Sequence, residues 1–223
     1  MLRPIPFAPG EYYHLYNRGT DKRVLFIDDA DYERFVSLLY LCNSGVPIHR
    51  SDHRARSLED ILYIEREATL VDIGAYCLMP NHFHILLREH SDGGISLFMK
   101  KLLTAYAMYF NNKYERKGTL FEGPFRSRHA GHDAYLKYLF AYIHLNPIGI
   151  IDTEWKEKHI RNRKVAKQFL SEYQYSSYLD YAGGGDERRQ SAILNKLAFP
   201  EYFEKKGEFN TYVNDWIAGS EVE

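Results

Sequence analysis

The chain has 223 residues, of which 45% are hydrophobic and 26% charged, and its formal net charge at pH 7 is −1. This length predicts one domain of ordinary size, or a domain with an appendage, whose core needs no covalent staples. Cys42 and Cys77 stand in apolar surroundings without a metal-type spacing, and no stretch has the apolar length of a signal peptide or membrane span. We therefore expect a soluble, cytoplasmic protein without a disulfide framework.

The first half of the chain predicts a strand, a helix, a loop and two further strands. Residues 12–17 are rich in strand formers, and residues 31–42 show helical spacing of apolar side chains after an acidic start. Glycine, proline, serine and mixed charges predict a loop or insertion over residues 43–60. Residues 69–78 and 82–88 are strand candidates, and the proline between them favours a turn joining antiparallel neighbours.

The second half begins with a long helix, predicted over residues 95–114. Glycines punctuate residues 118–129, which predict a short strand and a loop, and residues 133–145 predict another helix. We expect this helix to stop at Asn146, because the residue before a proline is pushed out of helical geometry. The candidates for burial in the long helix are Leu97, Leu102, Leu103, Tyr106 and Phe110.

Strands separated by helices, with one adjacent strand pair, favour an α+β fold in which an antiparallel sheet is flanked by helices. We divide the chain into a domain over residues 1–150 and a basic, mostly helical C-terminal extension over residues 151–223. The glycines of residues 182–185 predict a flexible break in this extension. Its aromatic residues are expected to pack a terminal helix on the core: Tyr202, Phe203, Tyr212 and Trp216.

The small net charge conceals two basic segments. Residues 99–129 contain seven lysines and arginines against two acidic residues, and residues 155–169 contain six against one. Local fields of this kind attract anionic partners whatever the total charge. The chain also has 19 tyrosines, most of which we expect to be buried or half-buried, although aromatic rings among basic residues suit stacking on exposed bases.

Two histidines flank one phenylalanine in the stretch "AYCLMPNHFHILL", residues 75–87. Side chains alternate along a strand, so His82 and His84 are expected on one face and Phe83 on the other. Their Cα atoms should lie roughly 6.5–7 Å apart, close enough for both rings to bind one divalent ion. For an arbitrary His-x-His pair, hydrogen-bonded structural histidines are the commoner outcome, and a metal site would need a third ligand.

The sequence resembles the single-tyrosine HUH transposases, in particular the branch of REP-associated tyrosine transposases among the IS200-like transposases. The segment "CLMPNHFHILL" resembles the His-hydrophobic-His strand of that family. Four further segments agree in the same order, and the resemblance covers roughly residues 10–182: "YYHLYNRGTDKRVLFIDDADYERF", "GTLFEGPFRSR", "YLFAYIHLNPI" and "YQYSSYLDYAG".

This resemblance implies a ferredoxin-like HUH endonuclease fold and an enzyme that cuts and rejoins single-stranded DNA. A tyrosine hydroxyl would attack a phosphodiester and leave a 5′-phosphotyrosine link and a free 3′-hydroxyl. The resemblance further implies a divalent metal, a hairpin substrate such as REP DNA, and no membrane partner. It leaves a homodimer open, because the insertion-sequence branch uses dimers with shared sites and the REP-associated branch is often monomeric.

By resemblance the nucleophile is Tyr142. Periodicity alone does not select it, because Tyr135 and Tyr138 share its helix face. Asn146 lies four residues after Tyr142 on nearly the same face, and we predict that it joins His82 and His84 as the third metal ligand. Two imidazoles with one amide oxygen suit Mg²⁺ or Mn²⁺, of which Mn²⁺ tolerates nitrogen better.

Five basic residues are predicted to contact DNA phosphates: Arg18, Lys100, Lys101, Arg126 and Arg128. Arg18 is proposed from the resemblance alone, and for the others a solvated surface charge is the competing interpretation. His14 is a weaker candidate with an expected structural role, and His144 should face away from Tyr142 by about 200°. The loop of residues 43–57, with His49 and His53, is expected to be disordered rather than bound to DNA.

Three rival functions remain open at this point. A metal-dependent nuclease or phosphodiesterase would use the histidine pair to activate water and would form no covalent link to DNA. A non-catalytic module would bind single-stranded nucleic acid on the same fold. A structural protein with a histidine-lined core would show no affinity for metal. The target sequence, and the choice between moving its own gene and processing host repeats, cannot be read from the chain.

Overall fold

The computed structural model describes residues 6–46, 56–183, 188–203, 205 and 207–219. Its centre is a four-stranded antiparallel sheet in the order β2-β3-β1-β4. The strands are β1 (Tyr12–Arg18), β2 (Val71–Met79), β3 (His82–Glu89) and β4 (Arg126–His129). All four agree with the predicted strands, and Pro80 and Asn81 form the predicted turn between β2 and β3.

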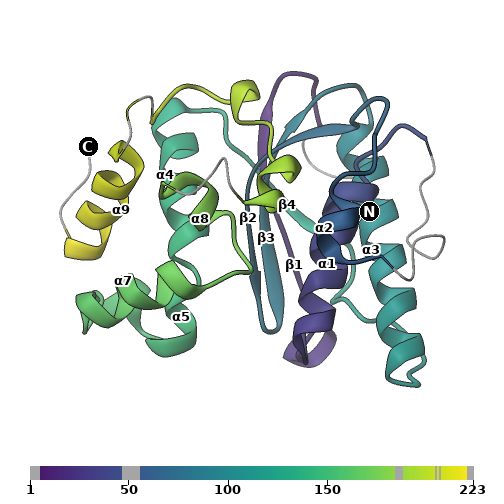
Figure 1. The fold of residues 1–223 in the computed structure, drawn as a ribbon, viewed down its shortest axis with the longest axis horizontal. Helices are drawn as coiled ribbons and strands as arrows, with labels where there is room; N and C mark the ends of the chain where they lie inside the picture. The colour runs from purple at the N-terminus through teal and green to yellow at the C-terminus, as the bar shows by residue number, and fades with distance from the viewer. Residues whose placement is uncertain (1–5, 47–55, 184–187, 204, 206, 220–223) are drawn as a thin grey trace.

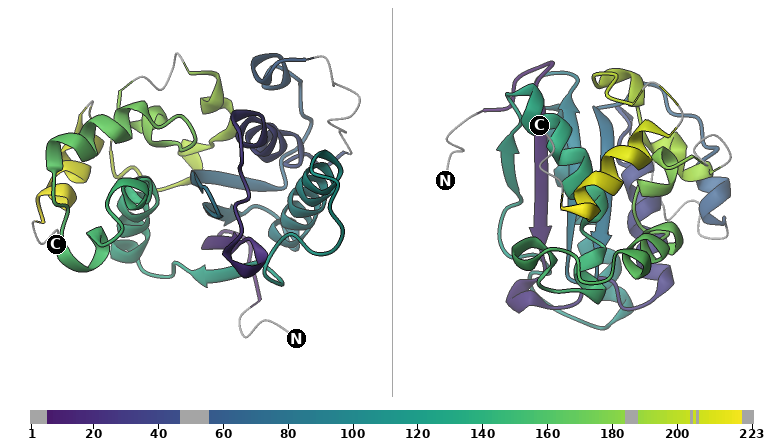
Figure 2. Two further views of the ribbon diagram at one scale, coloured as in Figure 1. Left: turned by 90° about the horizontal axis from the view of Figure 1, so that it is seen from below. Right: turned by 90° about the vertical axis from the view of Figure 1, so that its left-hand side faces the viewer.

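Helices cover both faces of the sheet, which confirms the predicted α+β class (Figure 1). On one face lie α1 (Asp29–Leu41) and α3 (Gly94–Lys113), with the short α2 (Leu58–Ile61) beside α1. On the other face α4 (Asp133–Leu145) packs against β2 and β3. The two views in Figure 2 show the same three layers from below and from the side. The described part of the chain contains no helix with the length and apolarity needed to cross a membrane.

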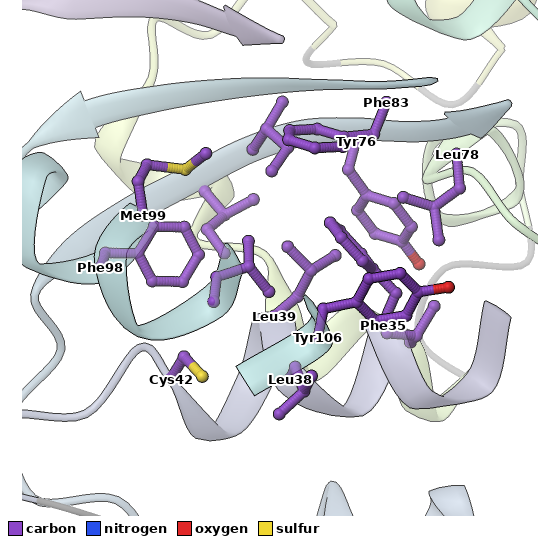
Figure 3. Close-up of a cluster of buried hydrophobic side chains, with 14 of the residues drawn as sticks. Phe35, Leu38, Leu39, Cys42, Tyr76, Leu78, Phe83, Phe98, Met99 and Tyr106 are labelled. Atoms are coloured by element: carbon purple, nitrogen blue, oxygen red, sulfur yellow. The ribbon is translucent and has the colours of Figure 1, made fainter. Parts of the chain in front are cut away.

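The larger core lies between the sheet and the α1/α3 layer. The ring of Phe35 in α1 lies there 5.1 Å from that of Phe83 in β3 and 5.0 Å from that of Tyr106 in α3. Figure 3 shows these residues and their neighbours. Because strand side chains alternate, β3 directs Phe83, Ile85 and Leu87 into this core. The even-numbered side chains of β3 are thereby directed to the α4 side.

The part of the chain that follows α4 is mostly helical and packs around α4 on that second face. It consists of α5 (Ile148–Ile151), α6 (Trp155–Lys158), α7 (Arg163–Glu172), α8 (Tyr178–Tyr181) and α9 (Glu208–Ala218). Short 3₁₀ turns occupy Thr20–Lys22, Arg189–Ile193 and Lys196–Ala198. Helix α9 contacts α4, with the ring of Trp216 5.1 Å from that of Tyr138, as expected for the C-terminal aromatic residues.

The segment that precedes α8 runs along the free edge of β2. Tyr175 and Ser177 exchange backbone hydrogen bonds with Leu78 and Tyr76, at 2.9 Å each. The side-chain oxygen of Ser177 also accepts the backbone N–H of Tyr76 at 2.9 Å. This edge pairing ties the C-terminal region to the sheet and fixes where its helices lie.

Several local expectations are corrected. Within the predicted loop of residues 43–60, α2 forms because Ser57 and Asp60 make a reciprocal capping box. Leu97 is 46% exposed, since it lies on the outer side of α3. Asn146 keeps helical backbone angles (φ −53°, ψ −37°) before Pro147, and the chain continues almost directly into α5. His49 and His53 lie outside the described residues, as do residues 184 and 185 of the predicted break.

Candidate active site

The strand register places seven polar side chains on the face of the sheet that α4 covers. His84 pairs with Tyr16, which pairs in turn with Arg126. His82 pairs with Arg18, and His14 pairs with Arg128. Paired residues in antiparallel strands project to the same side. The predicted common face of His82 and His84 is therefore confirmed, and β1 and β4 add a tyrosine, a third histidine and three arginines to it.

Helix α4 presents Tyr142 to this polar face. Its ring centroid lies 5.5 Å from that of His84 and 5.8 Å from that of His14, with edge-on geometry in both cases. Tyr138 and Tyr135 continue along α4, with successive ring centroids about 6 Å apart. The three tyrosines line one cavity of about 290 Å³ together with His14, Tyr16, His84 and Arg128. Of the three, Tyr142 is the one whose ring contacts the histidines.

The turn before β3 fixes the proton on His82. The Nδ1 atom of His82 lies 2.7 Å from Oδ1 of Asn81, an oxygen that can only accept. His82 therefore carries its proton on Nδ1, which leaves the lone pair of Nε2 free. The amide nitrogen of Asn81 donates to the carbonyl of Lys22 at 3.4 Å, which is consistent with this orientation.

His84 is oriented by His14. The Nδ1 atom of His84 lies 2.8 Å from Nε2 of His14, and both rings are buried. One nitrogen must donate and the other accept, since each neutral imidazole has one N–H and one lone pair. If the Nδ1 of His84 is the donor, the Nε2 of His84 carries the lone pair that could bind a metal. His14 is then the acceptor that holds the His84 ring in place.

Burial keeps these three rings neutral at pH 7. It lowers the pKa of His14 to about 4, with further repulsion from Lys156 and Arg128. It also lowers the pKa of His82 to about 4, where Lys156 and Arg18 repel the charged form. The pKa of His84 falls well below its ordinary value, because its ring is buried beside the two other histidines. Neutral imidazoles are the form that binds metal ions.

Asn146 and Lys156 complete the arrangement around Tyr142. The side-chain nitrogen of Asn146 donates to the backbone carbonyl of Tyr142 at 2.6 Å, which turns its oxygen outward. That oxygen accepts a hydrogen bond from the ammonium of Lys156 at 3.1 Å. The same ammonium donates to the hydroxyl of Tyr142 at 3.0 Å and lies 4.4 Å from the centre of its ring.

The donor set fits a divalent ion. Within the described residues no three His, Cys, Asp or Glu side chains form a metal-type cluster, so a complete site needs an oxygen of another kind. The amide oxygen of Asn146 is an oxygen of this kind, and the Nε2 atoms of His82 and His84 are the nitrogens that would serve as donors on the sheet. Two nitrogens and one oxygen suit Mn²⁺ or Mg²⁺.

The predicted DNA contacts fall into two groups. Arg128 lines the cavity of Tyr142 and lies over the ring of Tyr135 at 4.7 Å. Arg18 and Arg126 line an adjoining cavity of about 310 Å³ that also contains His82, and both arginines lie beside the carboxylate of Glu122. Lys100 and Lys101 lie on α3, across the sheet from Tyr142, and Lys101 donates to the carbonyl of Ser44 at 2.7 Å.

Three residues of the site had little or no signal in the sequence. His14 and Tyr16 alternate with Arg18 along β1, so a period-two pattern could have placed all three on one face. His84, the residue to which the ring of His14 hydrogen-bonds, is 70 residues away in the sequence. Lys156 lies in the basic segment after Asn146, and nothing in its spacing distinguishes it from its neighbours. His144 does face away from Tyr142, into contact with Ser177.

In this architecture a central strand of the sheet presents two imidazoles to a tyrosine on the helix that covers it. Residues 43–146 match the model of the family described as transposase IS200 like. This segment, which is similar to the IS200-like transposases, contains His82, His84, Tyr142 and Asn146.

One solved structure is similar over 81% of this chain and 84% of its own, with 12% sequence identity and a TM-score of 0.45. It is described as a REP-associated tyrosine transposase bound to a REP hairpin. At this degree of similarity it does not decide the substrate of the present chain. No match was found among curated proteins.

Proposed function

We propose that this protein is a transposase-like endonuclease and strand transferase that cleaves and rejoins single-stranded DNA through Tyr142. One juxtaposition supports the proposal above all others: the phenol of Tyr142 lies against His84 and His14 in a cavity open to solvent. A tyrosine kept only for packing would have no need of neutral imidazoles, an amide oxygen and an ammonium around its hydroxyl.

In the proposed reaction Tyr142 Oη attacks a phosphodiester phosphorus. The new oxygen–phosphorus bond joins the 5′ side of the DNA to the protein, and the bond to the 3′ oxygen of the preceding nucleotide breaks. The phenol loses its proton to solvent or a neighbouring base, and the leaving oxygen takes up a proton as a 3′-hydroxyl. A second 3′-hydroxyl can reverse the sequence on the phosphotyrosine, so strand transfer needs no nucleoside triphosphate.

We propose that His82, His84 and Asn146 hold a divalent ion, Mn²⁺ or Mg²⁺, which when bound supplies positive charge to the phosphoryl oxygens. The chain contributes hydrogen bonds that orient both rings. Asn81 leaves the lone pair of His82 free, and His14 can do the same for His84. Both contacts are made before any ligand arrives, so little reorganisation is needed at the moment of reaction.

The proposed substrate is single-stranded DNA next to a hairpin. Arg126 and Arg128 project from β4, the edge strand of the sheet, beside the two cavities that contain His82 and Tyr142. Guanidinium groups in this position suit backbone phosphates on either side of the cleaved bond. Because Tyr142 and the histidines meet within one chain, we further propose that one copy of the protein contains a complete site.

The test is covalent capture of DNA. The protein is incubated with a pool of labelled hairpin oligonucleotides with single-stranded flanks and Mn²⁺, and the products are separated on denaturing gels. We expect a protein–DNA band that Tyr142→Phe abolishes while DNA binding persists. Tyr138→Phe, one turn away on the same helix face, is the matched control and should retain the band.

Three outcomes would contradict the proposal. Cleavage without a covalent band would indicate a metal-dependent nuclease that uses water. Binding without cleavage of any oligonucleotide, in Mn²⁺ or Mg²⁺, would indicate a non-catalytic module. Persistence of the band in Tyr142→Phe and its loss in Tyr138→Phe would transfer the nucleophile to Tyr138.

A further inference from the structure

Lys156 is the basic side chain closest to the hydroxyl of Tyr142, and it lies outside the segment that matches the transposase family. It is the second residue of α6, a four-residue helix that follows α5. Its ammonium makes three contacts on the site: the Tyr142 hydroxyl at 3.0 Å, the Asn146 oxygen at 3.1 Å and the Tyr142 ring at 4.4 Å.

The neighbouring cations are paired with carboxylates. Lys158 pairs with Glu154 at 2.7 Å, and Arg161 pairs with both Glu154 and Asp152. Unlike these two residues, Lys156 forms no ion pair within the described part of the chain, although its side chain is exposed. Its ammonium lies close enough to the polar face of the sheet to disfavour the protonated forms of His14, His82 and His84, which lowers the pKa of each ring.

A phosphodiester brought to Tyr142 would meet this charge. Reacting atoms approach to about 3–3.5 Å before bond formation. A phosphorus at that distance from the Tyr142 oxygen places its nonbridging oxygens near an ammonium that is itself 3.0 Å from the same oxygen. Negative charge on those oxygens is the main feature that a phosphoryl-transfer site must stabilise.

We propose that Lys156 is a further catalytic residue, which holds the Tyr142 hydroxyl before DNA binds and then contacts a nonbridging oxygen of the phosphoryl group under attack. This inference rests on the proposed function. Lys156 retains its three protons throughout and donates hydrogen bonds only. The oxygen–phosphorus exchange and its two proton movements are those described above for Tyr142.

The proposal also gives a role to the hydrogen bond between the ammonium of Lys156 and the side-chain oxygen of Asn146. A lysine tethered to both the nucleophile and a candidate metal ligand holds the two groups together before substrate binds. When a phosphate arrives, hydrogen bonds to an anion are stronger than those to a neutral phenol and a neutral amide. The lysine then exchanges its two neutral partners for the anionic oxygen.

The experiment compares Lys156→Met, Lys156→Arg and Lys158→Met in single-turnover formation of the covalent band, with DNA binding measured separately. Methionine keeps much of the length of the side chain and removes its charge. We expect Lys156→Met to slow band formation by about 100-fold or more, the usual effect of removing one donor that stabilises transition-state charge. The dissociation constant for DNA should change by only about twofold, because one phosphate contact among many carries little of the affinity.

Lys156→Arg should recover most of the rate, and Lys158→Met should match the wild-type protein. Band formation at the wild-type rate in Lys156→Met would overturn the role of Lys156 and leave the proposed function intact. The role of Lys156 would also be overturned if the loss of rate were matched by weaker DNA binding, or if Lys156→Arg were as slow as Lys156→Met. Absence of a covalent band in the wild-type protein would instead refute the proposed function, and the role of Lys156 with it.

Discussion

Acidification should destabilise the folded protein through His144, a histidine outside the cavity of Tyr142. This ring is fully buried in α4. Its Nδ1 donates to the carbonyl of Phe140 and its Nε2 accepts from the hydroxyl of Ser177, both at 2.7 Å. The contact with Ser177 joins α4 to the segment along β2, and so helps to set the rotation of the helix that presents Tyr142.

Burial lowers the pKa of His144 from 6.5 to about 3. The unfolded chain therefore binds more protons than the folded chain between these two values, and stability must fall as pH decreases through that window. Each pH unit within the window is equivalent to about 1.4 kcal/mol. Between pH 7 and pH 5 the contribution of His144 is about 2 kcal/mol, since the unfolded histidine is only partly protonated near its own pKa.

The variant His144→Gln isolates this contribution. Glutamine can keep part of the hydrogen bonding and has no charge to gain, while His14, His82 and His84 titrate in both proteins and cancel in the comparison. Denaturant unfolding at pH 7 should show a variant less stable by about 1–3 kcal/mol, from the altered hydrogen bonds. At pH 5 this deficit should shrink by about 2 kcal/mol. A deficit that is the same at both pH values would show that the folded state accommodates a charged His144, and would refute the reasoning.

Two further predictions concern the polar face of the sheet. His14→Phe keeps a ring against Tyr142 but removes the hydrogen-bond partner of His84 Nδ1. The affinity for Mn²⁺, measured by calorimetry without DNA, should therefore fall by about tenfold or more, whereas His14→Gln should retain more of it. Equal affinity in His14→Phe and the wild-type protein would show that His14 has no part in metal binding. Arg128→Ala should lower DNA affinity and reduce the slope of log K against log salt by about one, as expected for one lost phosphate contact. Lys100→Ala, on the opposite face of the sheet, tests the contact predicted there, and a larger effect on the slope than that of Arg128→Ala would place the DNA on α3.

The elements of the fold were predictable because their signals are local. The proline between residues 78 and 82 marked the turn between β2 and β3, and acidic residues at the start of residues 31–42 marked the beginning of α1. The end of α4 shows the limit of such rules. Proline does interrupt the helix, but Asn146 itself remains helical, because its side chain bonds to the carbonyl of Tyr142 in the preceding turn. The general preference of a residue before proline for extended backbone angles is outweighed here by the hydrogen bond between Asn146 and Tyr142.

The residues of the site can likewise be separated into those that local geometry predicts and those that depend on packing. That His82 and His84 share a face follows from the geometry of any strand, and that Asn146 shares a face with Tyr142 follows from the geometry of any helix. Helical spacing could not choose among Tyr135, Tyr138 and Tyr142, since all three line the same cavity. Only the packing of α4 across β3 decides which ring reaches the histidines, and this crossing depends on the whole interface rather than on any one residue.

The remaining groups could not be predicted because they arrive through long-range packing. His14 bonds to His84 only in the register that pairs β1 with β3, since a shift by one residue would turn the ring into the opposite core. Lys156 reaches Tyr142 only because the chain turns back through α5 directly after Pro147. A proline that ends α4 at this point therefore has two effects: it fixes the last turn that contains Asn146, and it returns a basic segment to the nucleophile. Changing the length of the connection between Asn146 and Lys156 should consequently impair the reaction even when every side chain of the site is retained.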